Sequence, residues 1–352
     1  MRTKSFLIGL CGVVITSALL ILFSSAGQQN ENLKNIVSQT HQQIREFQEN
    51  LVAVRKKLDI DVKYLELLGF TQPIYNGTRY NFTIVTYIQS GQTASAILLS
   101  QNIALKLPNE VLLIYNLGLS EDDTRALSAY CNNSKCSVIT YEKLTEFPSY
   151  VNDDRTLHAF RPLIIKDALT RSKTILFMEN SIRVKGSSKD ISVYLKRVSE
   201  SGVLGWTTRQ AVSTRTHPKM FEYFQTDPES FLFVPMVSLD VVIFLDTDTV
   251  NQNIMLPWIK CTLTNECIHP IGAQSIGCRY DKKPLYRYSG CHAYDASAFN
   301  IVLGLTWNFD ETKYSTHFDS NLFYQESLEE ATRNLENKRK NISDTSESFT
   351  DE

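Results

Sequence analysis

Glu179 lies at a position in this 352-residue chain where chemistry could be placed. It directly follows the apolar run 174–178, and Asn180 and Ser181 come after it. A short, continuous apolar run is typical of a strand that is buried on both faces. Ligands of open α/β sheets gather at the carboxyl ends of strands. The sequence therefore predicts that Glu179 faces a ligand site.

A second acidic motif, Asp246-Thr247-Asp248, follows the apolar run 239–245 and forms a D-x-D pattern. Two carboxylates after a strand suit a divalent cation that bridges a nucleotide diphosphate, because Mg²⁺ and Mn²⁺ prefer oxygen ligands. Such a cation would offset the charge on a leaving diphosphate. The same residues could also form a polar turn, or contact an acceptor, since this short pattern is common by chance.

A third polar cluster opens a predicted helix at residues 295–305. Asp295 could act as the general base on an acceptor hydroxyl, or bind a sugar hydroxyl, with His292 beside it. The alternative is that Asp295 caps the helix and His292 packs beneath a disulfide loop.

The sequence contains neither a G-x-S-x-G elbow nor a G-x-G-x-x-G after a strand, so it supports neither a serine hydrolase nor a dinucleotide-binding fold.

Alternating strands and helices must position these residues. Repeated β-α-β units predict an α/β fold with a mainly parallel sheet and helices on both faces. With 43% hydrophobic residues, the chain can build one large domain plus appendages. The expected strands are 82–88, 110–115, 136–141, 174–178 and 239–245, with a turn or short strand at 202–206. The expected helices are 93–107, 125–130, 162–169, 187–198, 216–224, 250–263 and 295–305. Residues 334–352 are polar and charged, and we expect them to be disordered.

The N-terminal region predicts a route to the secretory lumen. Residues 6–24 form an apolar run long enough to span a bilayer, and the basic residues before it place the tail 1–5 in the cytosol. A signal peptide cleaved near residues 24–26 is the alternative, which would give a secreted protein. Both routes agree with four N-x-S/T sequons, which lie at Asn76, Asn81, Asn132 and Asn341.

Residues 28–70 are expected to form a helical stem. Val37, Ile44, Leu51 and Leu58 recur every seven residues, which is the pattern of a coiled coil. The stem could therefore join two copies of the chain in a parallel homodimer. It could equally be one amphipathic helix that lies on the globular body.

The cysteines and the charge limit the class of protein further. Six cysteines follow the apolar run, and their order suggests three local disulfides out of fifteen connectivities. Free thiols or zinc ligands are the alternatives, although no C-x-x-C pair occurs. The net charge of −2 gives no argument for a nucleic-acid partner. The suggested pairs are Cys131–Cys136, Cys261–Cys267 and Cys278–Cys291.

Several segments between residues 80 and 318 resemble a known family. The chain is similar to an uncharacterised, nematode-rich family of secretory-pathway type II membrane proteins, which in turn resembles the GT-A nucleotide-sugar glycosyltransferases. The resemblance implies a single GT-A-like domain at residues 80–323. The matching segments are 115–120 (YNLGLS), 147–151 (FPSYV), 160–166 (FRPLIIK), 175–181 (ILFMENS), 257–261 (PWIKC) with 267–270 (CIHP), and 291–300 (CHAYDASAFN).

The resemblance implies sugar transfer from a nucleotide-sugar donor to a glycan or glycoprotein acceptor, in the Golgi or ER membrane. Glu179 would lie near the diphosphate or a Mn²⁺ or Mg²⁺ ion, with Asp246 and Asp248 as the alternative ligands. Ser181 and Lys166 would contact the donor. Asp295 and His292, in the last matching segment, are the catalytic candidates.

Two departures from the family pattern leave it open whether the chain is an enzyme. The family's W-x-D-S-S is replaced here by a sequence with Glu179 in place of the aspartate. The family's CHRYDQSALN has Ala293 and Ala296 in place of a basic residue and a glutamine. These changes favour the alternative, a non-catalytic, membrane-tethered GT-A-like protein that binds a glycan or a partner.

Overall fold

The computed structural model describes residues 60–131, 135–153, 155–281, 283–317 and 321–347. The expected cytosolic tail, the membrane segment 6–24 and most of the stem lie outside these residues, as do the sequon at Asn132 and the last five residues. The part of the stem that is described contains the short helix α2 (Val62–Leu67). Within the described ranges, no helix is both long enough and apolar enough to cross a membrane.

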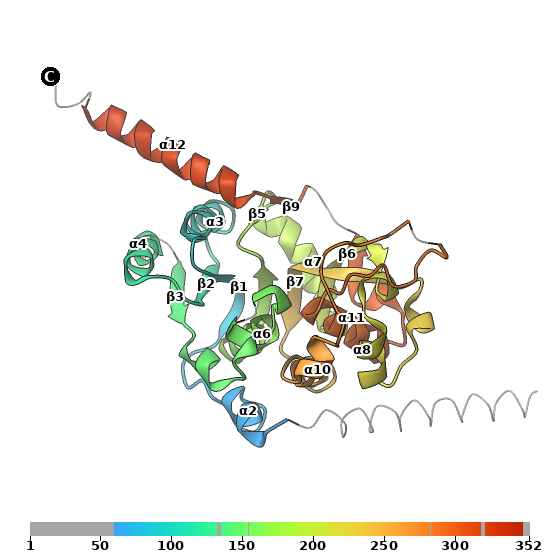
Figure 1. The fold of residues 1–352 in the computed structure, drawn as a ribbon. Helices are drawn as coiled ribbons and strands as arrows, with labels where there is room; N and C mark the ends of the chain where they lie inside the picture. Colours follow the sequence, from blue (N-terminus) through green and yellow to red (C-terminus); the bar gives the residue numbers. More distant parts are fainter. Residues whose placement is uncertain (1–59, 132–134, 154, 282, 318–320, 348–352) are drawn as a thin grey trace, which may run out of the picture. The chain divides into compact units, whose positions relative to one another are not determined.

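The core of the fold is a seven-stranded sheet in the order β3-β2-β1-β4-β7-β6-β8 (Figure 1). Strands β3, β2, β1 and β4 are parallel to one another, and β6 is parallel to β8. Strand β7 runs antiparallel to both of its neighbours, β4 and β6. The bounds are β1 Tyr80–Ile88, β2 Val111–Asn116, β3 Cys136–Thr140, β4 Ser172–Met178, β6 Val203–Ala211, β7 Pro235–Leu245 and β8 Ser315–His317.

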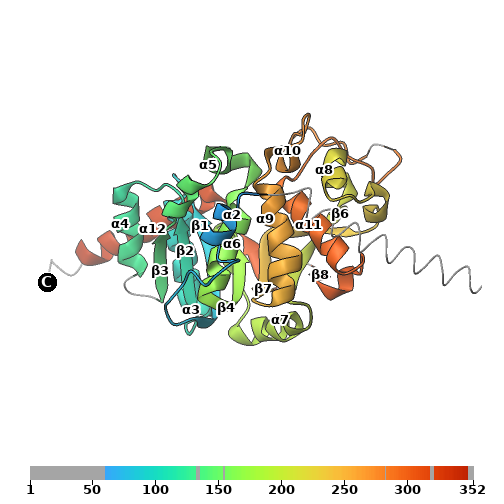
Figure 2. The same ribbon diagram turned by 90° about the horizontal axis from the view of Figure 1, so that it is seen from below.

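Helices cover both faces of the sheet, because successive side chains of each strand point to opposite faces. Leu176 packs in a core with α3 and α7, whereas Phe244 packs against aromatic rings of α9 and α11 on the other face. Figure 2 shows α6, α9 and α11 side by side. The helices are α3 Thr93–Lys106, α4 Glu121–Cys131, α5 Tyr150–Asp153, α6 Phe160–Arg171, α7 Ser188–Ser201, α8 Pro218–Tyr223, α9 Leu256–Thr262, α10 Asn265–Ile268 and α11 Asp295–Thr306.

The expected mixture of strands and helices and the mainly parallel sheet are confirmed. Two elements differ. The segment expected as a turn or short strand at 202–206 is the nine-residue strand β6. The helix expected at 250–263 begins as a π-helical stretch, Val250–Met255, and continues as α9. Pro257 lies where these two stretches meet, and its missing N–H removes one helical hydrogen bond.

All three expected disulfides are present in the structure. The first joins the end of α4 to the start of β3. The second closes the turn between α9 and α10. The third ties the irregular segment after α10 to the residues that lead into α11. The last two therefore hold the loops that approach α11.

Of the segment 334–352, expected to be disordered, residues 334–347 belong to α12, which runs from Leu328 to Glu347. Ser327 and Glu330 cap its first turn by reciprocal hydrogen bonds. Ala331 and Leu335 are buried on one face, four residues apart, in the same core as α3. Composition alone missed this short apolar stripe within a polar segment.

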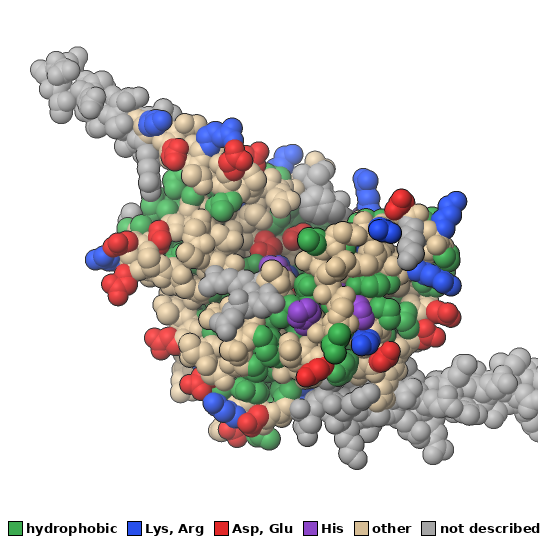
Figure 3. All heavy atoms as spheres, in the orientation of Figure 1, with side chains coloured by type: hydrophobic (Ala, Val, Ile, Leu, Met, Phe, Trp, Pro, Cys, Tyr) green, Lys and Arg blue, Asp and Glu red, His purple; other side chains and the backbone are tan. Residues whose placement is uncertain are grey.

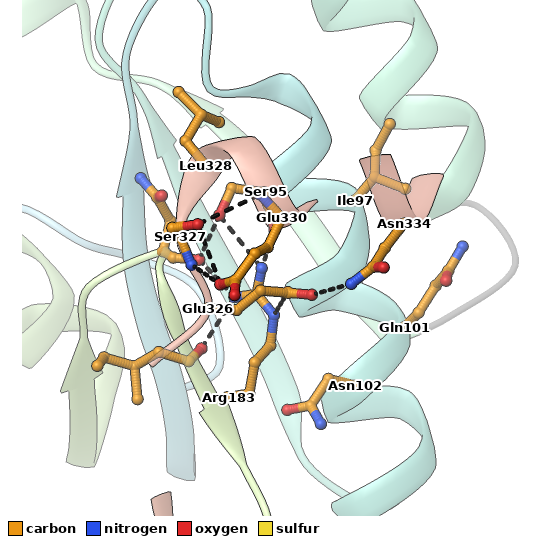
Figure 4. A network of polar contacts seen from close by, with 12 residues as sticks. Ser95, Ile97, Gln101, Asn102, Arg183, Glu326, Ser327, Leu328, Glu330 and Asn334 are labelled. Carbon is orange, nitrogen blue, oxygen red and sulfur yellow. Dashed lines mark hydrogen bonds and ion pairs between the residues drawn. The ribbon is translucent and has the colours of Figure 1, made fainter. Parts of the chain in front are cut away.

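A buried ion pair holds the start of α12 on the body (Figure 4). Arg183 lies in β5 (Ile182–Val184), which pairs with β9 (Phe323–Gln325), and its guanidinium is 2.7 Å from the Glu326 carboxylate. The Asn334 amide donates to the other Glu326 oxygen at 2.7 Å. Glu326 therefore links β5, β9 and α12.

We expect Glu326→Gln to lower the free energy of unfolding by about 1–3 kcal/mol, because it leaves the buried Arg183 guanidinium without its counter-charge. Glu329→Gln is the matched control. Glu329 pairs with Arg333 on the exposed face of α12, where such pairs contribute little. Urea unfolding measures both effects, and equal losses in the two variants would contradict the expectation.

Candidate functional site

The direction of β7 separates the two acidic motifs. Because β7 is antiparallel to β4, Met178 pairs with Val241 and Thr174 pairs with Leu245. Glu179 therefore lies where the parallel strands have their carboxyl ends. Asp246 lies at the opposite ends of these strands, where its N–H donates to the carbonyl of Lys173 at the start of β4.

Asp246 is part of a cluster of hydrogen bonds and ion pairs at the start of β4. Its carboxylate pairs with Arg79 at 2.6 Å and accepts from the Asn251 amide at 2.7 Å. Lys166 donates to Asn251 at 2.7 Å and lies over the ring of Phe70. Lys166, expected near Glu179, therefore belongs to the Asp246 cluster. Asp248, beside it in sequence, is exposed.

At the carboxyl ends of the parallel strands, Arg161 lies between Glu179 and Asp295, the two carboxylates that the sequence analysis identified. Its guanidinium is 2.8 Å from Glu179 Oε1 and 3.1 Å from Asp295 Oδ2. The Tyr87 hydroxyl, from the end of β1, donates to Glu179 Oε2 at 2.6 Å. Four elements meet here, because these residues come from α6, β4, α11 and β1. The carbonyl of Ser181 accepts from the Glu326 N–H, and Ser181 does not line the cavity beside Arg161.

One guanidinium must balance two carboxylates at this place. Burial raises the pKa of Asp295 to about 7, and the charge of Arg161 opposes that rise only in part. Burial also raises the pKa of Glu179 against the opposing charge of Arg161. With a single cation, one carboxyl group of the pair takes up a proton near neutral pH.

His292 supports the site and is not placed to transfer protons. Its Nδ1 accepts from the His217 N–H at 3.1 Å, and its Nε2 lies 3.1 Å from the Ile268 carbonyl. Burial lowers the pKa of His292 to about 3, so the ring stays neutral. Both ring nitrogens are engaged by backbone groups, which fits the packing role beneath the Cys278–Cys291 loop.

A cavity of about 360 Å³ opens beside Arg161 and Asp295. The space-filling view of Figure 3, in the orientation of Figure 1, shows acidic and histidine side chains close together near its middle. Sequence reasoning missed most of the residues that line the cavity, since they come from loops and from strand positions that carry no motif. Those with side chains able to bind a polar ligand include Thr156, His158, Thr208, Gln210, Arg215, Ser238, Asp240, Ser275 and Tyr294.

Asp240 is the exposed carboxylate of this lining. The Ser238 hydroxyl donates to its Oδ2 at 2.6 Å. Its carbonyl accepts from the Glu179 N–H at 2.9 Å, which places the two acids on neighbouring strands. A single polar residue within the apolar run 239–245 was the only signal in the sequence.

The backbone is strained on two sides of the cavity. His158 and Tyr294 both line it, with φ angles of 49° and 46°. Such conformations cost on the order of 1–3 kcal/mol for residues other than glycine, and they gather at functional sites. Tyr294 directly precedes Asp295, whose carbonyl accepts from the Trp258 indole at 2.9 Å. These contacts fix the start of α11 against the cavity.

Glu179 and Asp295 do not fit a Mg²⁺ or Mn²⁺ ion. Both oxygens of Glu179 are engaged, by Tyr87 and Arg161, and both oxygens of Asp295 lie within 3.3 Å of the Arg161 guanidinium. Over the part of the chain that the structure describes, no group of three or more acidic, histidine or cysteine side chains could hold a metal. The positive charge that Glu179 and Asp295 face is that of Arg161.

No family model matches the sequence, and no curated protein matches it either. Solved structures that are similar to the chain include three glycosyltransferases. The mannosyltransferase Ktr4p from S. cerevisiae is 10% identical with a TM-score of 0.42, over 80% of this chain and 80% of that one. Mouse xyloside xylosyltransferase 1 is 11% identical with a TM-score of 0.37, over 69% and 86%. The bifunctional glycosyltransferase WbbM is 12% identical with a TM-score of 0.35, over 56% of this chain and only 38% of its own length.

Proposed function

We propose that this protein is a glycosyltransferase that takes a sugar from a nucleotide-sugar donor and binds its substrates in the cavity beside Arg161. The observation that carries the proposal is the position of this cavity. Strand β1 lies between β2 and β4. Helix α3, which follows β1 and leads to β2, packs in the same core as Leu176, whereas α6, which leads from β3 into β4, contacts α9 on the other face. Such a switch point, at the carboxyl ends of the strands, is the usual ligand site of open α/β sheets. The Tyr87–Glu179 hydrogen bond joins the ends of β1 and β4 there. Arg161, the partner of Glu179, lines the adjoining cavity, whose strand residues come from β6 and β7.

Asp240 is the residue that we assign as the base. Its exposed carboxylate can accept the proton of an acceptor hydroxyl while that oxygen attacks the anomeric carbon of the donor sugar. The bond from the anomeric carbon to the nucleoside diphosphate breaks in the same step. Asp295, held by Arg161, binds sugar hydroxyls and takes no part in this proton transfer.

The proposal extends to the cell compartment. Three disulfides suit an oxidising environment such as the secretory lumen. With the apolar run 6–24 as an anchor, the body would lie in the lumen of the Golgi or ER. The acceptor would then be a glycan or a glycoprotein.

A second candidate function is non-catalytic binding of a glycan or a protein partner. The contacts of Arg161 favour it, because Glu179 and Asp295 are both engaged by protein groups. Ala293 and Ala296 line the cavity without offering a polar side chain.

We expect the full-length protein, purified in detergent, to release the nucleoside diphosphate from at least one sugar of a UDP- and GDP-sugar panel. Asp240→Asn should lower that turnover about 10²- to 10⁴-fold while the donor still binds, because the amide cannot accept the proton. Asp122→Asn, an exposed acid of α4, serves as the control. Donor binding without turnover across the panel would favour the non-catalytic function, and no donor binding at all would overturn the proposal.

A further inference from the structure

Arg215 is a cation of the cavity lining that has no carboxylate partner among the described residues. It ends the short 3-10 turn Ser213–Arg215, directly after β6. One of its terminal nitrogens donates to the Tyr280 hydroxyl at 2.8 Å. Its buried Nε has no acceptor within the described part of the chain. No acid in the described ranges therefore forms an ion pair with this guanidinium.

The backbone of Arg215 is fixed to the start of α11. Its carbonyl accepts from the Ala293 N–H at 3.0 Å and from the Ser297 hydroxyl at 2.9 Å. Residues 293–296 line the same cavity as Arg215. The N-terminus of a twelve-residue helix carries a partial positive charge, which adds to the charge of the guanidinium.

Among the described residues, no ion pair joins Arg215 to the other charged side chains of the cavity lining. Arg161 is engaged by Glu179 and Asp295. Asp240 accepts from Ser238, on β7. Arg215 is thus the charged group of the lining that is left to bind an anion from the ligand.

We propose that Arg215 binds a phosphate group of the ligand directly, and that this binding needs no divalent cation. A planar guanidinium can donate two parallel hydrogen bonds to a phosphate, which a single charged point cannot do. Glu179 and Asp295 do not fit a metal ion, and no group of three metal ligands occurs in the described part of the chain, so a cation of the protein would meet the negative charge. The inference rests on the proposed function in one respect, since it takes the phosphate to be that of the nucleotide-sugar donor.

Calorimetric titration of the full chain with GDP, UDP and inorganic pyrophosphate tests this, first in EDTA and then in Mn²⁺. We expect binding in EDTA, and Arg215→Gln should weaken it about tenfold to a hundredfold. Arg215→Lys should restore only part of the affinity, because it keeps the charge but loses the fork geometry. Arg197→Gln is the matched control, since the Arg197 guanidinium donates to the carbonyls of Thr312 and Ser315 outside the cavity. Thermal unfolding of each variant confirms that it is folded.

The outcomes separate this inference from the proposed function. Nucleotide binding that requires Mn²⁺, or that survives Arg215→Gln unchanged, overturns the role of Arg215 and leaves the glycosyltransferase proposal standing. Arg215-dependent binding of pyrophosphate without any nucleotide binding supports the phosphate site and overturns the nucleotide-sugar donor. Absence of pyrophosphate and nucleotide binding under both conditions overturns the phosphate site.

Discussion

Arg161→Met is expected to lower the free energy of unfolding at pH 7 by about 3–5 kcal/mol, the cost of removing one partner from a buried ion pair. Methionine fills much of the space but leaves Glu179 and Asp295 without a counter-charge. Asp295 is only 1% exposed, so water cannot replace the guanidinium. Both carboxyl groups would then bind protons, because an unpaired buried charge is very costly. Urea unfolding at pH 7 measures the loss.

The same replacement should be milder in acid. At pH 5 more of the two carboxyl groups are already protonated in the wild-type protein, so less charge is left unpaired by the loss of Arg161. Arg125→Met is the control, because Arg125 pairs with Asp122 on the exposed surface of α4. A loss below 1 kcal/mol for Arg161→Met at pH 7, equal to that of the control, would show that Arg161 does not balance the two acids.

The stability of the protein is expected to fall as the pH rises from about 4 to 7, with Asp295 as the main cause. Its pKa is raised to about 7 in the folded protein, whereas an unfolded aspartate titrates near pH 3.9. Between these values the folded state binds more protons than the unfolded state, so unfolding becomes easier as protons are removed. The contribution of the Asp295 proton to the stability of the folded state is complete below about pH 4 and is lost as the pH passes 7. The raised pKa of Glu179 acts in the same direction.

The free energy involved is about 3–4 kcal/mol over that range, shared with Glu179 because Arg161 couples the two groups. Asp295→Asn should remove most of this pH dependence, since the amide stays neutral and still accepts from Arg161. The variant should therefore be more stable than the wild type at pH 8. Unfolding temperatures between pH 4 and 8 provide the measurement, with Asp122→Asn as the control. A pH profile of Asp295→Asn that matches the wild type would contradict the prediction.

Residue patterns were sufficient to locate most strands and helices. The buried runs at 174–178 and 239–245 became β4 and β7, and the helix expected at 295–305 became α11. Local periodicity was enough because these runs are long and strongly apolar. The disulfides followed from the order of the cysteines, since each joins neighbours in sequence. Residues 334–347 were the exception, since two buried side chains of α12 were hidden in a polar composition.

The placement of the site residues depended on information that the sequence does not carry. A strand has the same two-residue alternation whether it runs parallel or antiparallel to its neighbour. The sequence could therefore not show that β7 ends beside the start of β4, away from Glu179. That direction placed Asp246 and Lys166 in a structural cluster, and it brought Asp240 to the cavity instead.

The sequence by itself determined that Glu179 follows a buried strand, that Asp295 opens a helix, and that the chain alternates strands with helices. Only the tertiary structure decided that these two acids share Arg161, because α6, β4 and α11 meet through contacts far apart in the chain. Burial then raised the pKa of both acids. Local sequence does not show this, because desolvation depends on every surrounding element. The same packing brought Arg215 next to the start of α11, where no carboxylate of the described residues pairs with it.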